Sequence, residues 1–129
     1  MILLDTQAVA WLALAPEKLS LAADAAIAAA SKEGGIAIAD KTLWELAMMW
    51  SKKKMDLDTP LSEFLLSVEQ HCVVLPLTAA IAERSVQFGN NFPSDPADRI
   101  IAATALVHGL FLVTADKSIR ASGEVPCIW

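Results

Sequence analysis

The stretch that decides the fold is DPADRIIAATALVHGLFLVTAD, residues 95–116. Residues 97–108 have the apolar spacing of a helix, and Gly109 follows at the position where a C-cap glycine is common. Residues 110–113 form a short continuous apolar run, which is typical of a buried parallel strand. Helix, glycine turn and buried strand predict one unit of a parallel α/β sheet. Asp116 lies just beyond the end of that strand.

The rest of the chain repeats this alternation of apolar runs and helices. Further strands are expected at residues 2–4, 36–38 and 73–75, with a fifth candidate at 125–128. Helices are expected at residues 6–14, 21–30, 43–53, 60–70 and 79–88, and a loop at 89–96. Continuous apolar strands between helices predict an α/β/α sandwich with a parallel central sheet of four or five strands. With no repeat or linker, residues 1–129 are expected to form a single domain.

Composition excludes several classes of protein. The 129 residues are 55% hydrophobic and 19% charged, with a mean hydropathy of +0.47, which is too apolar for a disordered chain. The longest apolar stretch, residues 8–15, is too short for a membrane span, and no basic residue precedes it as in a signal peptide. A cytoplasmic protein is therefore expected. Cys72 and Cys127 have no CxxC partner, which favours buried, reduced thiols over a zinc site or a redox pair.

Four carboxylates fall where the ends of predicted strands meet. Asp5 directly follows the first strand, and Asp116 lies three residues beyond Val113. Glu45 lies in the first turn of the helix after the second strand. Because the carboxyl ends of parallel strands share one edge, at which ligands bind, we expect Asp5, Glu45 and Asp116 to meet there. Asp98 opens the helix before the fourth strand, so the fold rather than its spacing places it with them.

Each carboxylate also fits a helix cap. The candidate caps are Thr42 with Glu45, Asp95 with Asp98, Asp5 before residue 6, and Asp116 before Lys117. Each cap contributes about 1 kcal/mol of stability. Capping and metal binding are compatible, because a helix N-terminus favours the ionised carboxylate that a metal needs. Asp95 is interpreted as a cap and not as a ligand.

The net charge of the chain points to a cation among the four acids. Ten Lys and Arg stand against fifteen Asp and Glu, giving −5, so nucleic acid cannot be held by overall charge. Without the four carboxylates the net charge would be −5 + 4 = −1. Gathered carboxylates repel one another unless they hold a hard divalent cation, and oxygen ligands select Mg²⁺ or Mn²⁺ over zinc. Such a site performs phosphoryl transfer through metal-activated water.

Five motifs occur in one order over nearly the whole chain. They are LLDTQAVAW (3–11), TLWELAM (42–48), DPADRIIAATAL (95–106), HGLFLVTAD (108–116) and the closing CIW (127–129). This ordered set resembles the PIN-domain ribonucleases, particularly the VapC-like toxins of prokaryotic toxin–antitoxin pairs. The resemblance implies a PIN-like α/β/α sandwich that cleaves RNA with Mg²⁺, or with Mn²⁺. It departs from the family at residues 90–94, where relatives often carry basic or histidine residues.

The resemblance also implies residue roles. Asp5, Glu45, Asp98 and Asp116 match the four acidic positions of the family, and Thr114 matches its hydroxyl position. Asp5, Asp98 and Asp116 are then expected to hold the metal, with Glu45 beside it through water.

The expected partners are the RNA substrate and a VapB-like antitoxin. The antitoxin could place an Arg or Lys among the carboxylates and an apolar helix near Trp11, Trp44 and Met48. These apolar side chains, together with Met49, are interpreted as core or as partner-facing surface, and not as base-stacking residues. Such a surface also suits an oligomer, and a homodimer is expected.

Basic residues near the acids allow two interpretations each. Arg99 and Lys117 adjoin proposed ligands, so either could contact a phosphate or pair with a site carboxylate. Lys52-Lys53-Lys54 is either a solvated helix end or a phosphate-binding patch. His71 and His108 lie late in their helices, where structural roles are expected and general-base catalysis is not.

Two other functions compete with the nuclease. A receiver-like phospho-acceptor domain has a similar sheet, but it needs a neighbouring acidic pair, and Asp5 is followed by Thr6 and Gln7. It also needs a lysine after a late strand, where this chain has Thr114. A PIN-like module that binds RNA or a partner without cutting is disfavoured by the presence of all four acids.

Overall fold

Five short strands form one parallel sheet in the computed structural model, which describes residues 1–129. The strands are β1 (Ile2–Leu4), β2 (Ile36–Ala39), β3 (Val73–Leu75), β4 (Leu112–Val113) and β5 (Cys127–Ile128). Their order across the sheet is β3-β2-β1-β4-β5, and every neighbouring pair is parallel. The predicted α/β sandwich with a parallel sheet is therefore confirmed, with the fifth strand included.

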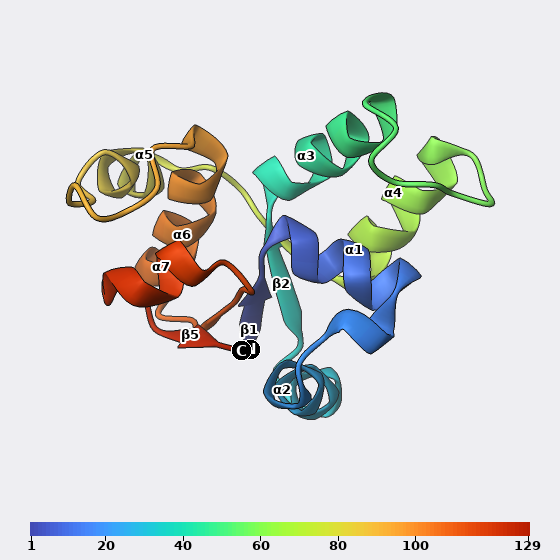
Figure 1. Ribbon diagram of the computed structural model, residues 1–129, viewed down its shortest axis with the longest axis horizontal. Helices are drawn as coiled ribbons and strands as arrows, with labels where there is room; N and C mark the ends of the chain where they lie inside the picture. The colour runs from blue at the N-terminus through green and yellow to red at the C-terminus, as the bar shows by residue number, and fades with distance from the viewer.

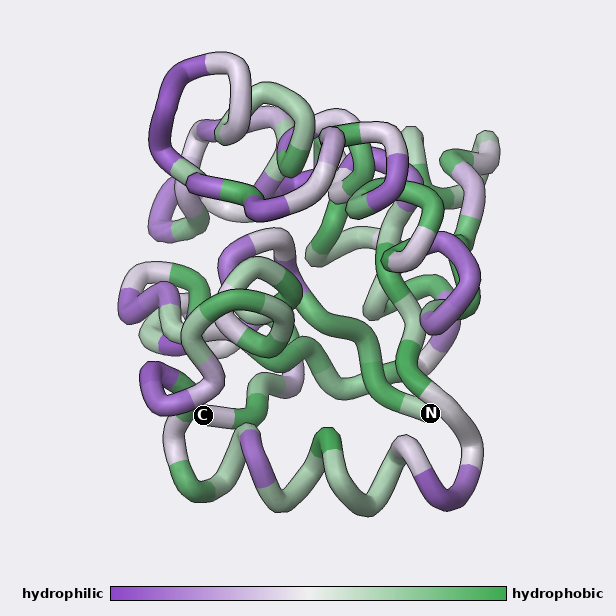
Figure 2. Tube along the Cα trace, turned by 90° about the vertical axis from the view of Figure 1, so that its right-hand side faces the viewer, coloured by the Kyte–Doolittle hydropathy of each residue, from purple (hydrophilic) through white to green (hydrophobic).

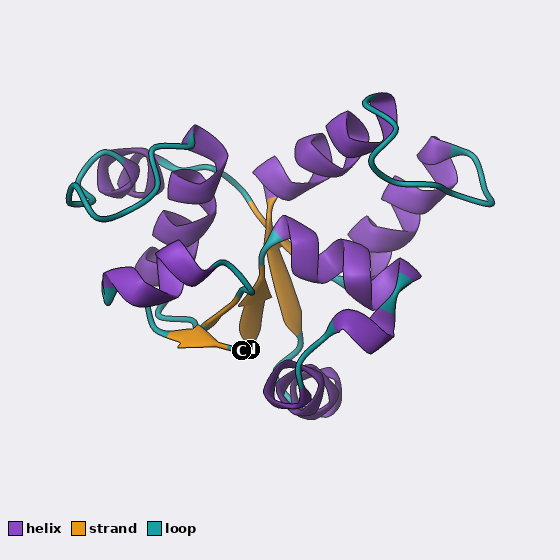
Figure 3. Cartoon of the chain, in the orientation of Figure 1, coloured by secondary structure: helices purple, strands orange, loops and turns teal.

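Helices cover both faces of this sheet (Figures 1 and 3). They are α1 (Thr6–Leu14), α2 (Leu21–Lys32), α3 (Asp40–Ser51), α4 (Leu61–His71), α5 (Ala79–Ser85), α6 (Pro96–His108) and α7 (Lys117–Ser122), with a short 3-10 turn η1 (Pro16–Lys18). Figure 1 shows α5, α6 and α7 on one side of β1 and β2, and α1, α3 and α4 on the other. No helix is long and apolar enough to cross a membrane.

Alternating side chains of the central strand divide the core in two. Ile2 and Leu4 pack with Val9, Leu46 and Phe64 in one buried cluster on the side of α1, α3 and α4. Leu3, between them in sequence, packs instead in the buried cluster of the α5–α6 side. Strand residues point alternately to opposite faces, so a continuous apolar run is what a doubly covered sheet requires. Figure 2 shows these hydrophobic strands as the green centre of the molecule.

Several predicted boundaries are wrong by two or three residues, including the start of β5 at Cys127 instead of residue 125 and the end of α3 at Ser51 instead of residue 53. Helix α3 begins at Asp40 and not at residue 43, since Ala39 is its N-cap. Helix α5 ends at Ser85 because Phe88 leaves the helix to stack on Phe92, with ring centroids 4.0 Å apart. Strand β4 starts only at residue 112, since Gly109 turns left-handed at φ 65° and the next residues close the helix end.

The cysteines differ in part from the sequence interpretation, whereas the position of Trp44 decides between the two alternatives that the sequence left open. Cys72 and Cys127 are free thiols, as predicted, but both are only partly buried. Their partial burial raises the pKa of both thiols. Trp44 is 53% exposed, so it does not belong to the core and lies on the surface.

Candidate active site

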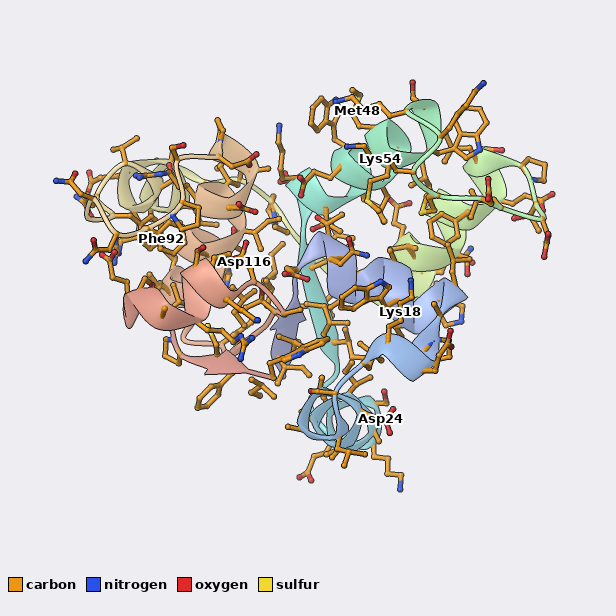
Figure 4. The ribbon with its side chains drawn as sticks, viewed as in Figure 1. Lys18, Asp24, Met48, Lys54, Phe92 and Asp116 are labelled. Atoms are coloured by element: carbon orange, nitrogen blue, oxygen red, sulfur yellow. The ribbon has the colours of Figure 1, made fainter.

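The four predicted carboxylates line a single pocket of about 410 Å³. The pocket is lined by Asp5, Thr6, Gln7, Trp11, Glu45, Met49, Asp98, Ile101, Leu112, Ala115, Asp116 and Ile119. It contains carboxylates from four separate segments of the chain and no Lys or Arg. Asp116 lies toward the middle of the molecule in Figure 4. The fold thus brings together the acids that strand ends and helix starts predict, Asp98 included.

Asp5 and Asp116 are held in place as helix caps. The Asp5 side chain accepts a hydrogen bond from the Ala8 N–H at 2.8 Å at the start of α1. The Asp116 carboxylate accepts from the N–H groups of Ser118 and Ile119 at 2.8 and 3.2 Å at the start of α7. Both predicted caps are confirmed. Each cap fixes the position of its carboxylate. Because β1 and β4 are neighbouring strands, the two carboxylates lie at the same carboxyl edge of the sheet.

Asp98 lies in the pocket because Asp95 takes the capping role beside it. The Asp95 carboxylate accepts from the N–H groups of Ala97 and Asp98 at 2.8 and 3.1 Å, and Pro96 occupies the first helical position of α6. The interpretation of Asp95 as a cap is confirmed. The Asp98 side chain is left to line the pocket.

Glu45 is held by a threonine pair and not by a capping box. Thr42 is the third residue of α3, not its N-cap, and its side chain is fully buried. The Thr6 hydroxyl donates to Glu45 Oε1 and lies 3.1 Å from the Thr42 hydroxyl. Sequence reasoning missed this contact between α1 and α3. The available signal was that Thr6 directly follows a carboxylate at the end of a strand.

Thr114 joins two of the acids. Its side chain is fully buried at the end of β4. Its hydroxyl oxygen accepts from the Asp116 N–H at 3.1 Å. The same side chain hydrogen-bonds the Asp5 carboxylate, which lowers the pKa of that group against the effect of burial. One hydroxyl therefore interacts with two of the site acids, Asp5 and Asp116.

Replacing Thr114 by Val should destabilise the protein by about 1–2 kcal/mol. The new methyl group fills the space but leaves the Asp116 N–H and the Asp5 carboxylate without their hydroxyl partner. Urea denaturation measures the change. Thr104→Val is a matched control, because Thr104 is equally buried and only donates to the Ile100 carbonyl within α6. Equal losses for the two variants would contradict the bridging role.

Burial and mutual repulsion oppose ionisation of two of these acids. Burial is the main cause that raises the pKa of Asp5 to about 6, and the charges of Glu45 and Asp116 add to it. Burial likewise raises the pKa of Asp98 to about 7, with repulsion from Asp95, Asp116 and other site acids. No group of three acidic, histidine or cysteine side chains is arranged to enclose a metal ion. Such spacing is what unpaired like charges favour.

The other polar residues singled out from sequence lie outside this pocket. The Arg99 guanidinium donates to the carbonyl oxygens of Pro93 and Phe92, so it holds the loop before α6. Lys117 is exposed and does not line the pocket. His71 is exposed and lies against the Ser67 carbonyl within α4, and His108 is exposed at the end of α6. No histidine lines the carboxylate pocket.

Comparison with protein families matches residues 2–124 to the PIN domain. The chain belongs to the PIN domain family. Over 120 residues this PIN domain is 35% identical to Ribonuclease VapC22 of Mycobacterium tuberculosis strain ATCC 25618 / H37Rv. That alignment covers 93% of this chain and 90% of the relative.

Solved structures of other proteins share the fold of this PIN domain. A toxin–antitoxin complex from Klebsiella pneumoniae matches with a TM-score of 0.67 at 25% identity, over 96% of this chain and 93% of that one. VapBC2 from Rickettsia felis, bound to a DNA fragment from its promoter, matches with a TM-score of 0.74 at 17% identity. That second match covers 98% of this chain and 97% of the other, and at this identity it bears on the fold alone.

Proposed function

We propose that this PIN domain is a Mg²⁺-dependent endoribonuclease, the toxin of a toxin–antitoxin pair. The observation that carries the proposal is the pocket in which Asp5, Glu45, Asp98 and Asp116 meet without a basic side chain. Family membership and 35% identity to a ribonuclease support RNA as the substrate. The same four acids disfavour a PIN-like module that binds without cutting.

The chemistry of the four donor side chains suits a hard divalent cation, although their spacing in the structure does not enclose one. All four side chains offer only oxygen, which suits Mg²⁺ or Mn²⁺ and not zinc. Burial is the main cause of the raised pKa values of Asp5 and Asp98, and repulsion from the neighbouring acids adds to it. When bound, the metal ion supplies activated water and stabilises charge on the scissile phosphate.

Within this proposal the residues have separate tasks. Asp5, Asp98 and Asp116 hold the metal, with Asp5 and Asp116 oriented by the helix N–H groups that they cap. Glu45 would lie beside the metal, with Oε1 accepting the Thr6 hydroxyl and its second carboxylate oxygen still available to a water molecule. Thr114 keeps two of the ligands in register through its hydrogen bonds.

The inhibiting partner that we propose is a VapB-like antitoxin. Similarity to a toxin–antitoxin complex at 25% identity supports such a partner. An antitoxin Arg or Lys placed among Asp5, Asp98 and Asp116 would satisfy carboxylates that have no cation of their own. Trp11, which lines the same pocket and lies 5.7 Å from Trp129 between ring centroids, offers an apolar contact beside that cation. Coexpression with a VapB-like protein tests this, and undiminished RNA cleavage by the complex would contradict it.

The direct test of the proposed function is RNA cleavage by the purified chain. We expect cleavage in Mg²⁺ or Mn²⁺, no cleavage with a chelator, and recovery when the metal is returned. A protein that binds RNA but leaves it intact in every divalent metal would instead be the non-cleaving module.

Metal-free protein should lose stability as the pH rises from 5 to 8. The folded-state pKa values, about 6 for Asp5 and about 7 for Asp98, lie above the ordinary value of 3.8. The folded state therefore binds more protons than the unfolded state in this range. The resulting stabilisation of the folded state is fully present below pH 4 and is lost as the pH rises through 6 and 7. Since Asp98 is only partly buried, we expect a loss of only about 1–3 kcal/mol.

Chemical denaturation at several pH values measures this loss. Mg²⁺ at pH 8 should restore the stability, because binding to the folded state alone raises the free energy of unfolding. Asp98→Asn should flatten the pH dependence. A metal-free protein whose stability does not change between pH 5 and 8 would contradict the electrostatic description of the pocket.

A further inference from the structure

A second groove of about 420 Å³ adjoins the carboxylate pocket. It shares Glu45 and Met49 with that pocket. Its lining comes from α3, from the turn after α3 and from the start of α6: Lys41, Trp44, Glu45, Met48, Met49, Lys52, Lys54, Asp95, Pro96 and Ala97. Figure 4 shows Met48 and Lys54 beside α3. A ligand bound in this groove can extend along the surface of the protein into the neighbouring carboxylate pocket.

The two depressions have opposite charge. Four carboxylates and no Lys or Arg line the first, whereas Lys41, Lys52 and Lys54 line the second. The groove holds three of the ten basic residues of an otherwise acidic chain. One of its two acids, Asp95, is engaged by two backbone N–H groups, and the other, Glu45, by Thr6. The lysines are therefore the charges that remain available to a ligand.

The turn after α3 places three consecutive lysines differently with respect to the groove. Lys53 adopts a positive φ of 57°, a conformation that side chains other than Gly, Asn and Asp rarely take. The Lys53 and Lys54 N–H groups close the helix end on the carbonyls of Trp50 and Met49, and buried Met55 follows. This turn puts Lys52 and Lys54 into the groove and leaves Lys53 out of its lining. The chain thus provides a charge-matched control within one turn.

The groove is also lined by the aromatic ring of Trp44, which belongs to α3. Trp44 is 53% exposed within the groove, and the Lys41 Nζ lies 4.0 Å from the centroid of its ring. A cation and an exposed aromatic ring are therefore available within the span of one nucleotide. Stacking of bases on such rings, with cations on the backbone, is how single-stranded nucleic acid is bound without sequence readout.

We propose that this groove binds the single-stranded RNA that flanks the scissile phosphate. Lys41, Lys52 and Lys54 contact backbone phosphates, and Trp44 stacks on a base. The proposal rests on the proposed function, RNA cleavage at the carboxylate pocket, and adds the site that holds the substrate there. Charge and stacking together favour RNA over an acidic protein, because Trp44 offers a ring on which a base can stack and an acidic peptide has no base to place there.

The first test measures RNA binding without cleavage. Asp98→Asn protein in Mg²⁺ is titrated against a short fluorescein-labelled single-stranded RNA of mixed sequence, and anisotropy gives the Kd. Adding Lys52→Gln and Lys54→Gln should weaken binding about tenfold and reduce the slope of log K against log salt by about 0.7 for each lost contact. Adding Lys53→Gln alone, the matched control, should change Kd less than about twofold. Equal effects at all three lysines would overturn the proposal.

The second test separates binding from chemistry in the active protein. Lys52→Gln/Lys54→Gln should raise KM for a long single-stranded RNA with little change in kcat, since uniform binding is lost. Trp44→Ala should weaken RNA binding about tenfold, while Trp44→Phe keeps most of it. Unchanged binding in Trp44→Ala, with a melting temperature like that of the parent, would remove the stacking role.

Failure of this proposal is distinguishable from failure of the proposed function. If the parent protein cleaves RNA and the groove variants bind and cleave as it does, only the groove is wrong. If the parent protein neither binds nor cleaves RNA in Mg²⁺, the nuclease itself is wrong. If the groove variants keep RNA binding but lose an antitoxin in coexpression, the groove is a protein surface and the proposal is overturned.

Discussion

Asp98→Asn should abolish RNA cleavage and leave the metal-free protein as stable as the parent or more so. Burial and the charges of neighbouring acids raise the pKa of Asp98 to about 7, so ionising it at pH 8 costs free energy that an amide does not incur. We expect a gain of up to about 1 kcal/mol at pH 8, because the group is only partly buried. Cleavage should fall at least about a thousandfold, which is about 4 kcal/mol in the activation barrier.

Opposite signs make this variant informative. If Asp98 only completed a helix start, the Asp98→Asn substitution would leave both cleavage and stability near the parent values. Thermal melting without metal and an RNA cleavage assay with Mg²⁺ are made on the same preparation. A clear fall in melting temperature of the metal-free variant would contradict the repulsion between the pocket acids.

Two substitutions of Asp116 should separate capping from catalysis. Asp116 accepts hydrogen bonds from Ser118 and Ile119 N–H groups, and Asn is an equally good N-cap residue. Asp116→Asn should therefore keep the cap and lose cleavage, again by about a thousandfold or more. Asp116→Ala should lose both, with stability lower than that of the Asn variant by about 1 kcal/mol.

Asp95 supplies the matched control for this pair. It caps α6 as Asp116 caps α7, but it does not line the carboxylate pocket. Asp95→Asn should keep both the cap and cleavage within about threefold, since no proposed ligand is lost. If Asp95→Asn were as inactive as Asp116→Asn, removal of any carboxylate near α6 would suffice, and the assignment of ligands would be wrong.

Strand ends and caps were readable from the sequence because they depend on neighbours in the chain. Asp5 and Asp116 each follow a buried strand and cap the next helix, and both features appear in the structure. The parallel sheet then brings them together, since β1 and β4 are neighbours. The position of Asp98 in the pocket depends on the fold and not on local spacing. The capping role of Asp95 next to it was predictable from the DPAD spacing.

Contacts between distant segments were not readable in this way. Thr42 has the spacing of an N-cap, but its hydroxyl pairs with that of Thr6, 36 residues away. Trp44 has the helical spacing of a core residue and is half exposed. In each case a tertiary contact or its absence, which local spacing does not encode, decides the outcome.

The order of the site residues along the chain bears on when the protein becomes active during its synthesis. Asp5 precedes the other site acids in the chain, whereas Asp116 and its strand β4 follow them. A growing chain therefore lacks the fourth carboxylate, and its central strand β1 lacks one of its two neighbours, until residues 112–116 are made. The proposed nuclease has no complete site before these residues leave the ribosome, so the sequence order itself delays its toxicity.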